Sequence, residues 1–261
     1  MKKRIFTYWV NKTGEEMPDY IKMCMESWRR HIEDLEIIVL NHENLSKWID
    51  LTMDFEAFKR VTLPMQSDIV SYYVLYKHGG IYMDADTIVT KDIFEQIAQF
   101  NENKIYTFGN PQERTIHVAF IASLKKNQKM LFSGIKKAQS NMSKLIRGQM
   151  SISWDIFSNS IYHEMIRNDE KKVFEIMDRI ESGGILETVM QTGNPAKDYF
   201  EFYFNNNDMD IEYIINKIKF GVVLLHNSWT PDEYKKITRE TILNDNRMLS
   251  RLLKYSIGYI E

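Results

Sequence analysis

The chain has 261 residues, a formal net charge of −2 and a pI near 6.3. Its length fits one medium-sized domain, and a hydrophobic fraction of 44% is enough to form a full core. The charge gives no long-range attraction for nucleic acid or anionic lipid, which argues against a nucleic-acid-binding function, and short basic runs such as Lys136-Lys137 and Lys235-Lys236 are interpreted as solvated helix faces.

At the N-terminus an apolar run ends at Asn11, which is too short for the hydrophobic region of a signal peptide. No segment approaches the roughly 20 apolar residues that cross a bilayer. Cys24 is the only cysteine, so an internal disulfide is impossible and a reducing compartment is favoured. We therefore expect a cytoplasmic protein whose membrane contact, if any, is peripheral and at the inner face.

A strand, a helix and a strand are predicted in turn within the first 40 residues. Residues 6–10 are aromatic and β-branched, and residues 18–31 have apolar side chains at helical spacing. Residues 35–40 are apolar except for Glu36, and such a run predicts a strand buried on both faces. This order predicts an α/β fold with a parallel sheet.

Helical periodicity continues to about residue 60, and a strong helix is predicted over residues 66–78. Gly79-Gly80 ends it, because glycine tolerates a left-handed cap, and residues 81–83 read as a short strand. The remaining elements are predicted as strands at 104–108, 118–121 and 220–225, mainly helical structure over 126–190 with breaks near Gly148 and Gly183-Gly184, and a packing helix over 239–259.

The short strand at 81–83 runs directly into Asp84-Ala85-Asp86. Two carboxylates separated by one residue at the end of a strand point the same way, at the sheet edge where open α/β folds bind ligands. Hard oxygen ligands there suit Mg²⁺ or Mn²⁺, which would bridge diphosphate oxygens and neutralise charge on a departing diphosphate. A lone Asp-x-Asp is a weak signal, so its interpretation depends on the residues around it.

Residues 67–86 resemble the Asp-x-Asp region of family-32-type glycosyltransferases and bacterial capsular polysaccharide synthesis proteins, a pattern shared by the clostridial glucosylating toxins. The matching residues, in order and spacing, are Ser67, Asp68, Gly79, Gly80, Tyr82, Asp84 and Asp86. Ser71 stands where the family has an arginine that helps to hold the donor. The resemblance implies a GT-A-type, three-layer α/β/α fold with a mixed, mostly parallel central sheet and additional helices.

The resemblance also implies roles for individual residues. Asp86 is the main metal ligand, while Asp84 contacts ribose or sugar and helps to bind the metal. Asp68 holds a hydroxyl of the transferred sugar, and Tyr82 belongs to the same donor site. Tyr8 or Trp9, at the end of the first strand, packs beside the nucleotide base. For Trp9 a core or rim position is an equal alternative.

His226-Asn227-Ser228-Trp229 follows the predicted strand at 220–225, so we expect it to meet the edge that carries the two aspartates. By the resemblance, a late His and a Ser-Trp pair cap the metal and the diphosphate. His226 is a candidate metal ligand, with Asn227 as its rival and a structural histidine as the alternative. Ser228 and Trp229 are expected in the donor site. Trp229 is expected to be catalytic with the two aspartates, because an indole N–H can donate to a phosphate oxygen.

These features predict a bacterial, metal-dependent glycosyltransferase that moves a hexose from a nucleotide diphosphate sugar, a UDP-hexose, to a hydroxyl of a capsular or cell-surface glycan or a lipid-linked oligosaccharide. The resemblance implies retention. No carboxylate is marked as a nucleophile, which favours front-face substitution guided by the leaving diphosphate. One domain is expected over residues 1–261, with a nucleotide-sugar-binding half at 1–125 and a helical acceptor-side elaboration with a closing strand and helix at 126–261.

Two other functions compete with this prediction. A haloacid-dehalogenase-like phosphatase also uses an Asp-x-Asp after an apolar strand, but it places the motif on its first strand and follows it with Gly-Thr. Here the motif lies some 80 residues into the chain and is followed by Thr87-Ile88. A non-catalytic sugar-nucleotide-binding protein is the second alternative, and Ser71 is the one residue in its favour.

Overall fold

The computed structural model describes residues 3–12, 14–169, 172–205 and 208–259. In these residues the strands are β1 (Arg4–Tyr8), β2 (Glu36–Leu40), β3 (Gly80–Met83), β4 (Thr87–Val89), β5 (Ile105–Asn110), β6 (Thr115–Ser123), β7 (Phe174–Asp178) and β8 (Val222–Leu224). The helices are α1 (Asp19–His31), α2 (Leu45–Trp48), α3 (Phe55–Arg60), α4 (Leu63–His78), α5 (Ile93–Ile97), α6 (Lys129–Ile146), α7 (Asn159–Arg167), η1 (Glu187–Met190), α8 (Pro195–Phe200), η2 (Glu201–Asn205), α9 (Ile211–Lys217), α10 (Asp232–Lys235), α11 (Arg239–Leu243) and α12 (Met248–Ile257).

Six strands form the central sheet of the described residues, in the order β2-β1-β3-β6-β5-β7. β1 is parallel to β2 and β3, and β5 is parallel to β7, whereas β6 is antiparallel to both of its neighbours. The predicted α/β fold with a mixed, mostly parallel sheet is therefore confirmed. β4 and β8 pair antiparallel in a separate two-stranded sheet.

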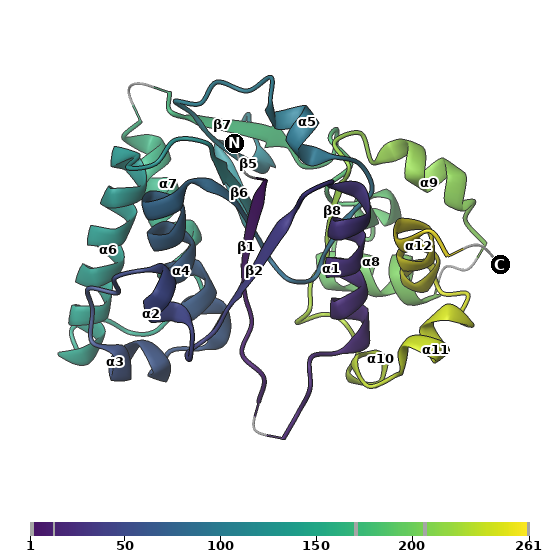
Figure 1. Cartoon of the computed structure of the whole chain (residues 1–261), viewed down its shortest axis with the longest axis horizontal. Coiled ribbons are helices and arrows are strands. Elements are labelled where there is room, and N and C mark those ends of the chain that lie inside the picture. Colours follow the sequence, from purple (N-terminus) through teal and green to yellow (C-terminus); the bar gives the residue numbers. More distant parts are fainter. Residues whose placement is uncertain (1–2, 13, 170–171, 206–207, 260–261) are drawn as a thin grey trace.

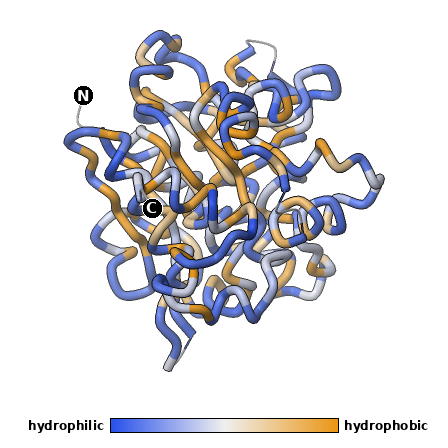
Figure 2. Tube along the Cα trace, turned by 90° about the vertical axis from the view of Figure 1, so that its right-hand side faces the viewer, coloured by the Kyte–Doolittle hydropathy of each residue, from blue (hydrophilic) through white to orange (hydrophobic). Residues whose placement is uncertain are grey.

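Helices cover both faces of the central sheet, which gives three layers (Figure 1). Because successive side chains of a strand point to opposite faces, Ile5 and Ile81 join a core with α1, the β4–β8 pair and α12. Phe6 and Tyr82 join the other core, with α4, α6 and α7. Figure 2 shows hydrophobic residues concentrated in the interior and hydrophilic segments at the periphery. None of the described helices combines the length and hydrophobicity that crossing a membrane needs.

The glycine pair sets the direction of β3. Gly79 ends α4 with φ 64° and donates its N–H to the Leu75 carbonyl at 2.9 Å. A Cβ on Gly79 would lie 3.0 Å from the Ser123 carbonyl oxygen, so both the dihedral angle and the space favour glycine. β3 begins at the next residue and is buried throughout. Because α4 ends at this glycine and β3 follows at once, Asp84 and Asp86 come directly after β3, at the edge of the sheet.

Three sequence predictions are wrong. β7 lies within a region predicted to be mainly helical; its five residues are too few to overcome the helical pattern of the flanking segments. β2 is only partly buried, because it is an edge strand rather than a strand covered on both faces. The predicted helix over 239–259 is two helices, α11 and α12, separated by residues 244–247.

Candidate active site

A tight turn after β3 carries the two aspartates. Asp84 donates its N–H to the Ala119 carbonyl at 2.9 Å, and its carbonyl accepts the Thr87 N–H at 3.1 Å. β4 starts at Thr87, which lies opposite Leu224 of β8. This register places the residues that follow β8 beside the turn that holds Asp86.

The residues after β8 form a second turn against the first. The His226 carbonyl accepts the N–H groups of Trp229 and Thr230 at 2.9 and 3.0 Å. The Asn227 N–H donates to Asp86 Oδ2 at 2.7 Å. The structure therefore brings together the two motifs, which are 140 residues apart and were expected to meet at this edge.

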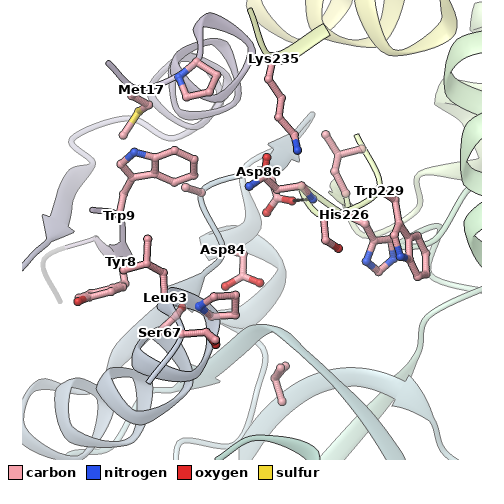
Figure 3. Close-up of a pocket in the computed structure, with 18 of the residues that line it drawn as sticks. Tyr8, Trp9, Met17, Leu63, Ser67, Asp84, Asp86, His226, Trp229 and Lys235 are labelled. Atoms are coloured by element: carbon pink, nitrogen blue, oxygen red, sulfur yellow. Dashed lines mark hydrogen bonds between the residues drawn. The ribbon is translucent and has the colours of Figure 1, made fainter. Parts of the chain in front are cut away.

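Both motifs lie in the wall of one large cleft, with a volume of about 1480 Å³. Nine of the ten residues expected in the site line it, namely Tyr8, Trp9, Asp68, Asp84, Asp86, His226, Asn227, Ser228 and Trp229. Figure 3 shows Trp9 and Met17 on one side of the aspartates, and His226 with Trp229 on the other. Tyr82 is the exception: its side chain is buried, and its hydroxyl lies 2.7 Å from Ser67 Oγ, which does line the cleft.

Burial of the carboxyl groups of Asp68, Asp84 and Asp86 disfavours their charged forms. Burial raises the pKa of Asp84, and the charges of Asp86 and Asp68 raise it further. Burial also raises the pKa of Asp86, although the Asn227 N–H opposes this shift. Burial raises the pKa of Asp68 to about 7. A cation placed among these groups would lower all three pKa values.

The fit to a divalent cation rests on Asp84 and Asp86, whose oxygens are the ligands that Mn²⁺ and Mg²⁺ prefer. The Asn227 side-chain oxygen already accepts a hydrogen bond from the Tyr20 hydroxyl. The ring of His226 lies 4.0 Å from that of Trp229, and its Nε2 is 3.7 Å from Glu187 Oε1. Across the described residues no three His, Cys, Asp or Glu side chains gather in a way that could hold a metal.

Tyr8 and Trp9 differ in exposure. The Tyr8 side chain is buried and donates its hydroxyl proton to Gln66 Oε1 at 2.7 Å. Trp9 is half-buried on the cleft wall, and its indole N–H donates to Asn11 Oδ1 at 2.7 Å. A flat, partly exposed ring beside the aspartates could pack against a nucleotide base.

Sequence reasoning missed two ionisable residues that lie with His226 on the opposite wall, Glu187 and His117. Glu187 is buried and lines the cleft, and its Oε2 has no hydrogen-bond partner among the residues that the structure describes. Burial raises the pKa of Glu187 to about 7, and it lowers the pKa of His226 to about 4 and that of His117 to about 3. Both imidazoles are therefore neutral at neutral pH. Glu187 follows a Gly-Gly break with no motif around it, so no sequence pattern indicates its place.

Lys235 and Lys236 also line the cleft, where Lys235 is half-buried and Lys236 is exposed, so their solvated face belongs to the cleft wall. Figure 3 shows Lys235 extending toward Asp86. Lys235 also pairs with Asp232 at 3.1 Å. The available sequence signal was their position six and seven residues after Trp229, within reach of the same turn.

Comparisons with known proteins identify one matching family model and several similar solved structures. The family model for capsular polysaccharide synthesis proteins matches residues 1–151. No curated protein sequence matches the chain. Similar solved structures include the PaToxG glycosyltransferase (TM-score 0.47, 14% identity, covering 84% of this chain and 85% of that one). They also include the apo form of the glycosyltransferase GlyE of Streptococcus pneumoniae TIGR4 (0.43, 14%, 94% and 63%) and mouse xyloside xylosyltransferase 1 (0.47, 9%, 88% and 99%).

The family match covers more than half of the chain. It includes β1, α4, β3 and the turn with both aspartates, which are the elements that build one wall of the cleft. The resemblance predicted from residues 67–86 is confirmed, and the chain belongs to the family of capsular polysaccharide synthesis proteins.

Proposed function

We propose that this protein is a metal-dependent glycosyltransferase that moves a hexose from a UDP-hexose to a hydroxyl of a capsular or cell-surface glycan, with retention of configuration. One observation carries the proposal: Asp84 and Asp86 lie together on the wall of a cleft of about 1480 Å³, with raised pKa values. A bound cation would stabilise the charged form of two carboxylates that lie this close together in a buried position. A cleft of this size also has room for a nucleotide sugar.

The two walls would hold different parts of the donor. Asp84 and Asp86 would hold the cation, which when bound supplies positive charge to the departing diphosphate. Trp9, with Tyr8 behind it, would pack beside the base, and Asp68 would accept a hydrogen bond from a sugar hydroxyl.

On the other wall, the Ser228 hydroxyl and the Trp229 indole N–H would donate to diphosphate oxygens. These roles assign different parts of the reaction to the two halves of the chain. Residues 1–125 bind most of the nucleotide sugar, and residues 126–261 supply the acceptor side together with the late Ser-Trp pair.

The reaction forms a bond between the acceptor oxygen and the anomeric carbon and breaks the bond from that carbon to the diphosphate. In a front-face substitution the acceptor hydroxyl enters on the side from which the diphosphate leaves, and its proton passes to a diphosphate oxygen. Positioning of the two substrates and stabilisation of the leaving group would then provide most of the catalysis.

A panel of nucleotide sugars with and without Mn²⁺ tests the proposal. We expect one UDP-hexose to raise the thermal midpoint in the presence of Mn²⁺, because a ligand that binds only the folded state stabilises it. The same donor should be slowly hydrolysed. The proposal fails if no donor stabilises the protein. Tight binding without hydrolysis or transfer would favour a non-catalytic binder, and rapid release of phosphate from a phosphomonoester would favour a phosphatase.

A further inference from the structure

One long stretch of the chain contains no acidic residue. Residues 114–154 include eight Lys or Arg and no Asp or Glu, whereas the rest of the chain has 26 basic and 36 acidic residues. The overall charge of −2 therefore conceals a segment of +8 in a protein that is otherwise at −10. Such an asymmetry points to an anionic partner for the basic part.

Most of this basic segment is α6 and the loop after it. The helix packs its apolar face, which includes Leu131, Ile135, Ala138 and Met142, into the core. Its other face is exposed, and the exposed residues of α6 and the next position include Lys129, Phe132, Lys136, Lys144 and Arg147. We call this set, together with residues 146–154, the basic face.

Acidic side chains close to the basic face are already engaged within the protein. Glu164 pairs with Lys137 at 2.7 Å, and within the described part of the chain no other lysine of α6 forms an ion pair. Asp155 accepts hydrogen bonds from the hydroxyls of Ser153 and Ser160. The remaining positive charge of the face is not neutralised by these contacts.

Exposed apolar side chains lie at one end of the basic face. Ile146, Ile152 and Trp154 are 61%, 57% and 73% exposed, and they fall within nine residues of the chain. The segment after them is tied to α6, because Asn141 Nδ2 donates to the Ile156 carbonyl at 2.7 Å. Three large apolar groups are thus displayed to solvent next to lysine and arginine.

We propose that the basic face docks on an anionic lipid bilayer. Lys and Arg are attracted to anionic headgroups, and Trp and Ile favour the boundary between headgroups and acyl chains. Nucleic acid or an acidic polysaccharide would complement the charge, but it would leave Ile146, Ile152 and Trp154 without an apolar partner. The combination of charge and apolar exposure therefore selects a lipid surface.

Docking in this way also orients the cleft. Trp154 lines the cleft as well as the basic face, so the rim of the cleft lies at the bilayer. If the proposed function holds, this arrangement gives a lipid-linked acceptor direct access to the donor site. The docking itself does not depend on that function.

Vesicle flotation of the full chain tests the docking. We expect the protein to float with phosphatidylcholine vesicles that contain about 30 mol% phosphatidylglycerol and not with pure phosphatidylcholine. Binding should fall at least about tenfold between roughly 0.05 and 0.5 M NaCl, since salt screens the attraction. No flotation with the anionic vesicles at low salt overturns the proposal, as does equal binding to both vesicle types.

Matched variants locate the surface. Lys136→Glu/Lys144→Glu should reduce binding about tenfold or more, and Lys197→Glu/Lys219→Glu, the same charge change at exposed sites elsewhere, should have a clearly smaller effect. Ile152→Ser/Trp154→Ser should weaken binding, whereas Ile180→Ser, at a site that is 56% exposed, should not. Equal losses in each variant and its control would overturn the assignment. Flotation needs no donor or acceptor, so its outcome is separate from that of the hydrolysis assay.

Discussion

The two walls of the cleft differ in how the chain builds them. The wall with Asp68, Asp84 and Asp86 comes from one continuous segment, in which α4, the glycine pair and β3 follow each other directly. The wall with Glu187 and Trp229 is assembled from separate segments: Leu224 of β8 donates its N–H to the Gly184 carbonyl at 2.8 Å, and β8 pairs with β4 beside the first wall. Local motifs therefore reveal the first wall and the His226–Trp229 part of the second, but the place of Glu187 is set only by the folded chain.

The walls also differ in charge. The first carries three carboxyl groups whose pKa values are raised, whereas the second carries one such carboxyl, Glu187, beside neutral imidazoles and the Trp229 indole. In the proposed function the first wall binds a cation and the sugar, and the second donates hydrogen bonds to the leaving group. Variants on each wall should consequently change different kinetic parameters.

The largest effect is expected at the centre of the first wall. Asp86→Ala should lower metal-dependent donor hydrolysis about 10³-fold or more, because the cation loses its main ligand. The fold should persist, since the substitution removes a buried charge rather than apolar packing. Hydrolysis rates over a range of Mn²⁺ concentrations, with circular dichroism of the variant, measure both points.

Glu16→Ala is the matched control for that variant. Glu16 is exposed and lines the same cleft from a loop of the N-terminal segment, where it pairs with Lys22 at 3.3 Å. Its removal should leave hydrolysis within about twofold. Normal activity in Asp86→Ala would contradict the proposal that the first wall binds a catalytic cation.

On the second wall, Trp229→Phe should lower kcat about 100-fold and leave the KM for the donor within about threefold. Phenylalanine keeps most of the ring but has no N–H to donate to the diphosphate. Trp9→Phe is the control on the first wall, because packing beside a base does not require the indole N–H. A rise in KM without a change in kcat would mean that Trp229 binds the donor but does not act on the leaving group.

The same contrast explains which parts of the fold and of the site can be predicted from the sequence alone. Residues 67–86 encode a helix, its glycine end, a strand and the acid pair in one run, so local rules predict both the structure and the chemistry. The sequence motif placed Asn227 near Asp86 as a side-chain ligand, but in the structure it is the backbone N–H of Asn227 that contacts Asp86. Glu187 and Lys235 reach the cleft through tertiary packing, and a periodicity pattern contains no information on that. β7 was missed for a similar reason, since a short edge strand is stabilised by β5 rather than by its own residues.

A smaller effect is expected for Asp68, which tests whether the first wall binds the sugar as well as the cation. Asp68→Asn should raise the KM for the donor about tenfold, because an amide accepts a weaker hydrogen bond from a hydroxyl than a carboxylate does. The value of kcat should change less. An unchanged KM would exclude Asp68 from the donor site.

Asp68 should also make the stability of the metal-free protein depend on pH. Its pKa is about 7 in the folded chain against an ordinary value of 3.8, so the folded state binds this proton more tightly. Its stabilising contribution is complete below pH 4 and is lost as the pH rises toward 7. In EDTA, Asp68→Asn should therefore gain roughly 1–3 kcal/mol relative to the wild type between pH 4.5 and 7.5, or about 3–8 °C in thermal midpoint. A difference that does not vary with pH would contradict this.

The smallest effect is expected for Glu187, and it bears on the chemistry of the second wall. A buried carboxyl on the cleft wall with a free oxygen could act as a nucleophile in a double displacement. Front-face substitution needs no such group, so Glu187→Gln should keep kcat within about threefold, because the amide preserves shape and packing. A loss of about 10⁴-fold, with a glycosylated Glu187 found by mass spectrometry in the wild type, would replace the front-face step by a covalent one. The second wall would then do more than stabilise the departing diphosphate.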